Sequence, residues 1–199
     1  MMRYENQKGY TLLEAIAVMA IISIVASTIV ATMGRMYDRY KTSRLTSQIV
    51  ELQKAIDQRF ASAESYRDLG NKLIKDENLA PGDIDFETQA LTEDEIEEGV
   101  QPNVSMRHKY GGTISVTTSG ANPLEYQITF TNVPQIPCVE LAMQDWEKNQ
   151  SSDLIYMTVN NTRLEWIGEN QDNIMPISVV RARNLCDSEK ENTLTWVFQ

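Results

Sequence analysis

The sequence is poor in the residues that usually carry catalysis. It has one histidine, within Arg107-His108-Lys109, and a histidine between two cations is more typical of an exposed loop than of a general base. The Gly-x-Ser-x-Gly, His-Glu-x-x-His and glycine-rich phosphate-loop motifs are missing. We therefore predict that the chain is not an enzyme and that it holds no cofactor or metal.

Positive charge is also scarce, with 18 lysines and arginines against 28 aspartates and glutamates and a formal net charge of −10. Such a surface repels phosphate backbones, so nucleic acid is not predicted as a primary ligand. The sharpest acidic run covers residues 93–98. It lacks the alternating Asp/Asn ligands and the glycine of a calcium loop, which favours a solvated face over a metal site.

Residues 10–80 contain no proline, and residues 10–33 contain a single charged side chain, Glu14. At about 1.5 Å per residue the apolar run 10–33 can cross a hydrocarbon core of about 30 Å, so we predict a transmembrane helix there. No small-x-small cleavage site follows the run, which argues against a secretory signal peptide. A carboxylate within a membrane helix is costly, so Glu14 indicates a function. Thr11-x-x-Glu14 also fits a helix capping box, and the two roles can coexist.

The start of this run resembles the processing site of type IV prepilins and the related pseudopilins. The resemblance is carried by Lys8-Gly9, then Tyr10-Thr11-Leu12-Leu13-Glu14-Ala15-Ile16 and the apolar run. It implies that residues 1–9 are a leader, that a membrane prepilin peptidase cuts after Gly9, and that Tyr10 becomes the methylated N-terminus. It also implies that Glu14 pairs with the N-terminal ammonium of a neighbouring subunit during assembly.

The charges that flank the predicted span favour the opposite membrane orientation from the one that this resemblance implies. The leader carries the cations Arg3 and Lys8, whereas four cations follow the span: Arg35, Arg39, Lys41 and Arg44. The positive-inside rule alone would place the N-terminus outside. The resemblance implies a cytoplasmic leader, with the prepilin in the inner membrane and the assembled pilus on the bacterial surface.

Beyond the span the helix is predicted to continue as an amphipathic segment over residues 34–61. Its apolar side chains recur at three- and four-residue spacing: Leu45, Ile49, Leu52, Ile56 and Phe60. This stripe must lie against a folded domain, which we place at residues 62–199. Gly34 is the predicted weak point of the helix, because glycine costs about 1 kcal/mol relative to alanine.

The remaining chain predicts a connecting region followed by an antiparallel sheet. Residues 62–100 are expected to hold short helices, one of them at residues 92–99. Strand patterns cover residues 112–118, 125–133, 153–159, 163–167 and 193–198. A helix is expected from Pro137 to Trp146, and residues 176–186 are ambiguous. The predicted fold class is α+β, with a long N-terminal helix packed on an antiparallel sheet.

The two cysteines, Cys138 and Cys186, form an even pair beyond a membrane anchor. This suggests a disulfide in an oxidising compartment, with two unpaired core thiols as the alternative. Residues 132–142 and Asn184-Leu185-Cys186 are similar to the two cysteine-bearing helices of type IVb pilins, the group of the toxin-coregulated and bundle-forming pili. That resemblance implies a disulfide-bounded region over residues 138–186.

The predicted function is that of a structural subunit of a type IV pilus, of the type IVb group, for adhesion, aggregation or motility. Its partners would be copies of itself in a helical filament, the prepilin peptidase, the assembly platform and minor pilins. The alternatives are a minor pilin, a type II secretion pseudopilin, or a monomeric membrane-anchored binding module. A simple tether needs no glutamate near its end, so Glu14 favours the filament.

Overall fold

The computed structural model describes residues 12–90, 102–120, 122–147, 153–187 and 191–199. The chain divides into two compact units, residues 1–40 and residues 41–199, which are described in turn. Helix α1 (Leu12–Phe60) is continuous through both, close to the predicted bounds 10–61. It stays helical through Gly34, and the predicted short helix at residues 92–99 lies outside the described residues.

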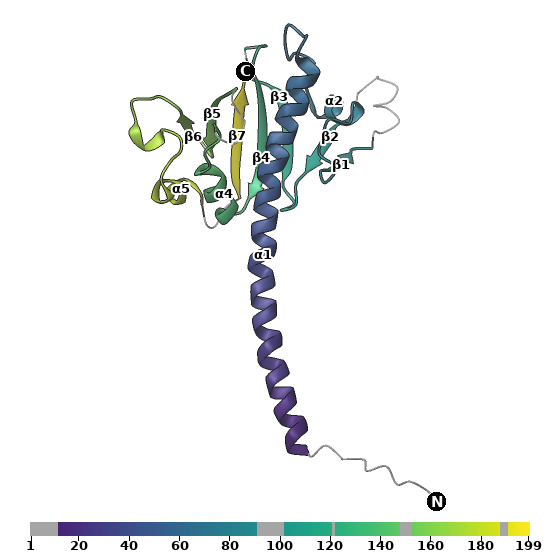
Figure 1. Cartoon of the computed structure of the whole chain (residues 1–199). Helices are drawn as coiled ribbons and strands as arrows, with labels where there is room; N and C mark the ends of the chain where they lie inside the picture. Colours follow the sequence, from purple (N-terminus) through teal and green to yellow (C-terminus); the bar gives the residue numbers. More distant parts are fainter. Residues whose placement is uncertain (1–11, 91–101, 121, 148–152, 188–190) are drawn as a thin grey trace, which may run out of the picture. The chain divides into compact units, whose positions relative to one another are not determined.

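The second unit is built on a seven-stranded antiparallel sheet in the order β1-β2-β3-β4-β7-β5-β6 (Figure 1). Its strands are β1 (Asp85–Thr88), β2 (Val104–Arg107), β3 (Thr113–Thr118), β4 (Tyr126–Val133), β5 (Leu154–Val159), β6 (Thr162–Glu165) and β7 (Asn192–Phe198). The short helices are α2 (Asn71–Asp76), α4 (Gln135–Ala142), α5 (Val179–Leu185) and the 3₁₀ turn η1 (Gln171–Asn173). The α+β fold class predicted from the sequence is confirmed.

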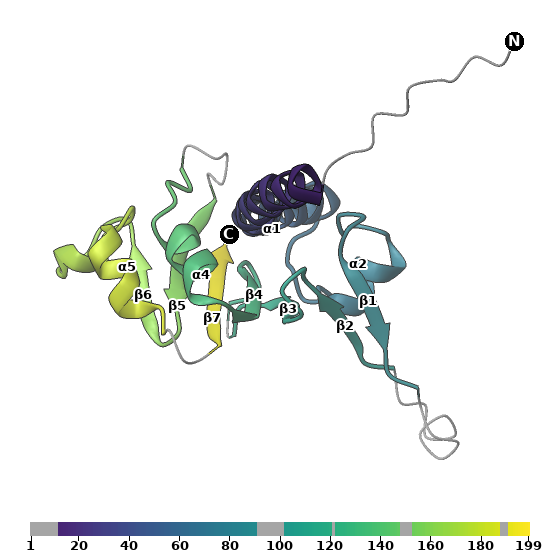
Figure 2. The same ribbon diagram turned by 90° about the horizontal axis from the view of Figure 1, so that it is seen from below.

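The last strand in chain order, β7, lies in the middle of the sheet between β4 and β5 (Figure 2). Trp196 on β7 is in register with Ile128 on one side and Met157 on the other. All three side chains are fully buried. The prediction that this apolar segment is a buried strand is therefore confirmed.

The second half of α1 supplies the helical side of the core. Four side chains of its predicted stripe, Leu45, Ile49, Leu52 and Ile56, have no exposed surface, and the fifth, Phe60, is partly buried. The four fully buried side chains belong to one buried cluster with sheet residues from β2 to β7. At roughly 1.5–3 kcal/mol for each fully buried aliphatic side chain, this stripe is a main source of the attachment of α1 to the sheet.

Two local predictions need correction, and one ambiguous segment is resolved. Strands β1 and β2 were not expected, because each is four residues long and β1 lies exposed at the sheet edge. Helix α4 begins at Gln135 with Pro134 as its N-cap, not at Pro137, and ends at Ala142. Trp146 lies beyond α4 but is fully buried, as predicted. The ambiguous segment forms α5, whose N-cap Ser178 accepts a hydrogen bond from the backbone N–H of Arg181.

Candidate functional site: the N-terminal helix and its attachment to the sheet

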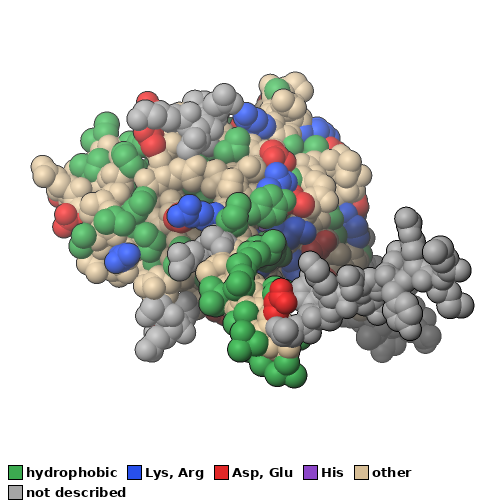
Figure 3. Space-filling model, turned by 60° about the horizontal axis from the view of Figure 1, so that its bottom comes forward, with side chains coloured by type: hydrophobic (Ala, Val, Ile, Leu, Met, Phe, Trp, Pro, Cys, Tyr) green, Lys and Arg blue, Asp and Glu red, His purple; other side chains and the backbone are tan. Residues whose placement is uncertain are grey.

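The first part of α1 has the length and composition of a membrane span. Within it, residues Leu12–Ile29 form an apolar window in which none of the residues is buried in the chain's own fold. Hydrophobic side chains cover the part of the helix that comes forward in Figure 3. The hydroxyls of Ser23, Ser27 and Thr28 donate to helix carbonyls at 2.7–2.8 Å, so these polar groups are already satisfied for an apolar solvent.

Glu14 lies in the first turn of α1 and its side chain is exposed. A carboxylate in the first turn of a helix interacts favourably with the positive end of the helix dipole. Gly9, Tyr10 and Thr11 lie outside the described residues. The predicted cleavage, methylation and capping box at these positions therefore remain predictions.

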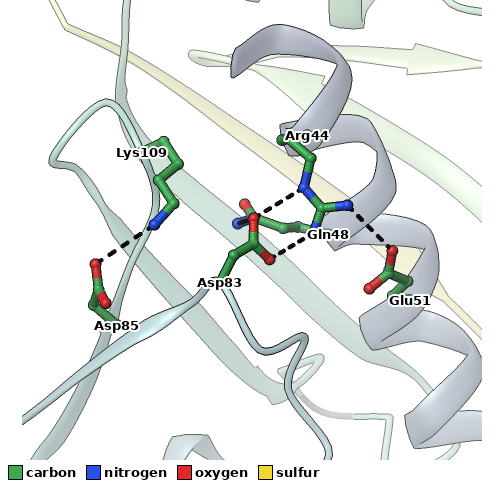
Figure 4. Close-up of polar contacts among 6 residues, drawn as sticks. All are labelled: Arg44, Gln48, Glu51, Asp83, Asp85 and Lys109. Atoms are coloured by element: carbon green, nitrogen blue, oxygen red, sulfur yellow. Dashed lines mark hydrogen bonds and ion pairs between the residues drawn. The ribbon is translucent and has the colours of Figure 1, made fainter. Parts of the chain in front are cut away.

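A charged and hydrogen-bonded cluster fixes the second half of α1 to the segment before β1 (Figure 4). Arg44 donates from Nε to Oδ2 of Asp83 at 3.0 Å and from Nη2 to Oδ1 at 2.7 Å. Gln48 donates to Oδ2 of the same carboxylate at 3.1 Å, while Glu51 lies 3.8 Å from Arg44. The Arg44 guanidinium holds the pKa of Asp83 below its ordinary value. Because Arg44 binds both oxygens of Asp83, the contact fixes the orientation of α1 relative to the segment before β1 as well as stabilising it.

Exposed ion pairs add to the pairing of the edge strand β1. Arg107 on β2 binds Glu87 on β1 with an Nε–Oε2 distance of 2.8 Å, and Lys109 lies 4.0 Å from Asp85 (Figure 4). Each such surface pair contributes little, about 0–1 kcal/mol. Charged side chains on the edge strand also disfavour pairing with a foreign strand.

A second polar contact joins α1 to the centre of the sheet. The hydroxyl of Tyr126, a fully buried residue of β4, donates to Oδ1 of Asp57 at 2.7 Å. Burial raises the pKa of Asp57, and the nearby Asp153 carboxylate adds to that rise. Burial likewise raises the pKa of Tyr126, with the neighbouring Asp57 charge as a further cause. The ring of Tyr66 packs against that of Tyr126 at a tilt of 53°, with 4.7 Å between ring centroids.

The predicted exposure of His108 is wrong. Its side chain is 3% exposed and stacks on Phe130, with 5.4 Å between centroids. Nε2 lies 2.8 Å from the carbonyl oxygen of Thr131 and so carries the proton, while Nδ1 accepts from the backbone N–H of Tyr110 at 3.3 Å. Burial lowers the pKa of His108. Both ring nitrogens are used by the neutral form, which makes this histidine structural rather than catalytic.

Gly112 lies directly against the buried ring of His108 and the backbone of Thr131. A Cβ at this position would lie 1.9 Å from the Thr131 carbonyl oxygen and 2.5 Å from Nε2 of His108. The close approach therefore requires glycine. The flanking cations hid this arrangement in the sequence, although Val104, Met106 and His108 alternate with the period of two expected of one buried strand face.

Asn71, which sequence reasoning missed, holds β2 and β3 together where their backbones separate. Its Nδ2 donates to the carbonyl oxygens of Val104 and Ile114, each at 3.1 Å, and its Oδ1 accepts from the backbone N–H of Val116 at 2.8 Å. The side-chain amide of Asn71 thus makes hydrogen bonds with the backbones of both strands, as a neighbouring strand would. The sequence carries no local signal for this role, because the partners lie 33 to 45 residues away.

The C-terminal region is held by a disulfide between Cys138 on α4 and Cys186 at the end of α5. The predicted bridge is confirmed, and both sulfur-bearing residues are buried. Gln135 reinforces it by donating to the Cys186 carbonyl oxygen at 3.1 Å. Between the two helices lies an open groove of about 550 Å³ that includes the exposed side chains Ile136 and Val179.

Among the described residues, no group of three or more His, Cys, Asp or Glu side chains is placed to hold a metal ion. The acidic run at residues 93–98 lies outside the described residues. The charged groups described above instead bind one another across elements. Two of these contacts, Arg44–Asp83 and Asp57–Tyr126, attach the second half of α1 to the rest of the second unit.

An exposed apolar helical span, continued by a helix half that is buried on an antiparallel sheet, is the architecture of type IV pilins. The family model described as PilS N terminal matches residues 39–199, and the model of the prokaryotic N-terminal methylation motif matches residues 5–30. The first match covers most of the chain, so the chain belongs to the PilS family of the type IV pilins. Membership of a pilin family agrees with the prediction that the chain is not an enzyme.

Among solved structures, the chain is similar to a type IVb pilin from Salmonella typhi. The two share 16% sequence identity over 76% of this chain and 97% of that chain, with a TM-score of 0.49. A search of curated proteins finds no match.

Proposed function

We propose that this chain is a structural subunit of a type IV pilus, of the type IVb group, that polymerises through the first part of α1. The single observation that carries the proposal is Glu14, the one charged residue in an apolar span whose side chains are exposed in the isolated chain. The match to the methylation motif over residues 5–30 supports processing at the same end.

The proposed assembly step pairs Glu14 with the N-terminal ammonium of a neighbouring subunit. In the lipid phase each isolated charge carries a large solvation cost, which a close ammonium–carboxylate pair between subunits offsets. Pairing therefore favours docking at one axial register over neighbouring ones. After docking, apolar packing of the α1 spans holds the subunit in the filament core.

Processing is the first part of the proposal. The peptidase must accommodate the residue before the cut, where a side chain is expected to clash, so Gly9→Val leaves the leader attached and abolishes assembly. The mature N-terminal mass of the wild-type protein tests cleavage before Tyr10 and methylation of Tyr10 together. An unchanged mature mass in the Gly9→Val variant contradicts the assignment.

The charge of Glu14 is tested by two substitutions in cells that carry the variant as the sole copy. Glu14→Ala is inserted, cleaved and folded, but does not enter filaments. Glu14→Gln keeps the hydrogen-bonding capacity of a helix cap and removes the charge, and it fails to assemble in the same way. Normal surface filaments built from Glu14→Gln would refute charge pairing and leave Glu14 with a capping role.

The partners that follow from this proposal are other copies of the chain, the prepilin peptidase, the assembly platform and minor pilins. The chain would reside in the inner membrane as a prepilin and at the bacterial surface once assembled. A monomeric membrane-anchored binding module would instead tolerate both substitutions of Glu14, because a tether needs only an apolar span.

A further inference from the structure

The open groove between α4 and α5, termed the α4–α5 groove, is an apolar surface of the second unit with a volume of about 550 Å³. Its apolar lining consists of four side chains: Ile136, Val139, Met143 and Val179. Two exposed side chains of opposite charge, Glu140 and Arg183, line it as well. The groove is therefore suited to an aliphatic side chain that has charges of both signs beside it.

A feature with these properties, Leu124, lies just before β4. Its side chain is 50% exposed, and it follows Pro123, whose carbonyl oxygen accepts a hydrogen bond from the backbone N–H of Tyr66 at 2.8 Å. The exposed cation Arg67 lines one small pocket together with Pro123, and the anion Glu125 follows Leu124 directly. Leu124 thus has one cation and one anion beside it, as the groove does.

Leu124 and the α4–α5 groove lie at opposite ends of β4. Leu124 is two residues before the first residue of β4, and α4 begins two residues after its last. At about 3.3 Å per residue, the 8 residues of β4 separate these ends by about 26 Å. Figure 1 shows α4 at the lower end of the sheet and the C-terminus, which pairs with the start of β4, at the upper end. One chain therefore cannot place its own Leu124 in its own groove.

We propose that Leu124 of one copy of the chain docks in the α4–α5 groove of a neighbouring copy. Arg67 then faces Glu140 of the neighbour. Glu125 faces Arg183 of the neighbour, and the two pairs of opposite charges fix the orientation of the contact. The inference rests on the proposed filament and deepens it by naming a contact between the globular units of successive subunits.

The contact joins two different surfaces, so it is heterologous. Each added copy leaves one groove and one Leu124 available, and such a contact builds an open filament when its rotation does not close a ring. One docked side chain buries far less than the roughly 1,000 Å² typical of a stable interface. The contact therefore forms between copies that their α1 spans already hold at a high effective concentration.

The test uses full-length chains that assemble in cells, with each variant as the sole copy. Leu124→Cys/Ile136→Cys places one thiol on each surface, and mild oxidation of isolated filaments gives a ladder of cross-linked multimers on a non-reducing gel. The native disulfide is buried, so only the introduced thiols react. Each single variant gives no cross-link, because like surfaces do not meet. The matched control is Ile167→Cys/Ile136→Cys, which uses another exposed aliphatic side chain and gives no ladder.

The charge pairs are tested separately. Arg67→Glu places a like charge opposite Glu140, which weakens each contact by up to about fivefold and lowers the yield of sheared filaments. Arg67→Glu/Glu140→Arg reverses both charges, keeps the pair and restores the wild-type yield. Should the cysteine pair impair assembly, this charge reversal decides by itself.

The proposal is overturned if filaments of Leu124→Cys/Ile136→Cys give no ladder, or if a single variant or the Ile167 control cross-links to the same extent. It is also overturned if the charge reversal fails to restore the yield. Filaments that form without the ladder overturn this contact alone. Wild-type chains that form no filaments overturn the proposed function and this contact with it.

Discussion

The hydroxyl of Tyr126 lies 2.7 Å from Oδ1 of Asp57, so a fully buried phenol is bound to a carboxylate whose charge is disfavoured by burial. The pair joins the middle of the sheet to the part of α1 that packs on it. It stabilises the attachment through the hydrogen bond and weakens it through the charge. The two contributions can be separated by substitution.

Asp57→Asn should unfold at higher denaturant concentration than the wild type at pH 7, because it keeps an acceptor for Tyr126 and removes the charge. The folded-state pKa of Asp57 is raised, so wild-type stability from this group is greatest below the unfolded value near 3.8 and is lost as pH rises through the folded value. The gain from Asp57→Asn should therefore shrink as pH falls toward 4. Urea unfolding of both proteins between pH 4 and 8 measures the difference in their free energies of unfolding. An Asp57→Asn variant that is less stable than the wild type at pH 7 contradicts the prediction.

Arg44 and Asp83 should show a coupling free energy of about 1–2 kcal/mol in a double-mutant cycle at pH 7, because two charge-assisted hydrogen bonds join side chains that are 29% and 23% exposed. The pKa of Asp83 is lowered, so this stability is present above about 3.8 and is lost as pH falls through the folded value. The control is the exposed pair Lys72–Asp76, for which we expect about 0.3–0.5 kcal/mol. Equal coupling in both pairs would contradict the role given to Arg44.

His108→Gln should cost about 1–3 kcal/mol at pH 7, because the ring stacked on Phe130 and its hydrogen bonds are lost. The pKa of His108 is lowered in the folded state, so its contribution is complete above the unfolded value near 6.5 and declines as pH falls below it. The stability gap between wild type and variant should therefore narrow from pH 7 to pH 5. A gap that is the same at both pH values would show that His108 does not titrate as described.

Reduction of the Cys138–Cys186 bridge should lower the free energy of unfolding by about 4 kcal/mol on the chain-entropy model, since the half-cystines are 48 residues apart. Alkylation of the unreduced protein should label no cysteine. Unfolding of a Cys138→Ser/Cys186→Ser variant, compared with the oxidised wild type, measures the loss. Two labelled thiols in the native protein would mean that packing alone holds this region.

The sequence predicted elements whose signal is local. The stripe Leu45, Ile49, Leu52 and Ile56 has a helical period over about three turns, and buried residues alternate with more exposed ones along most of β3 and β4. Strand β1 has no such pattern, because at the sheet edge its burial follows from its pairing with β2 rather than from its own residues.

The contacts that fix α1 were beyond sequence reasoning because their partners are far apart along the chain. Arg44 and Asp83 are separated by 39 residues, and Asp57 and Tyr126 by 69. For His108 the period of two is a local signal of burial, which the two neighbouring cations obscure. Charge neighbours along a strand point to the opposite face and say little about burial.

The place of β7 in the middle of the sheet sets the order in which the chain can finish folding. Both of its neighbours, β4 and β5, precede it in the chain, so each has an unpaired edge until residues 192–198 become available. Before β7 is available, the strands can pair only as two separate groups, one from β1 to β4 and the other from β5 to β6. Insertion of β7 is therefore a late, long-range step in folding, which closes two exposed strand edges at once.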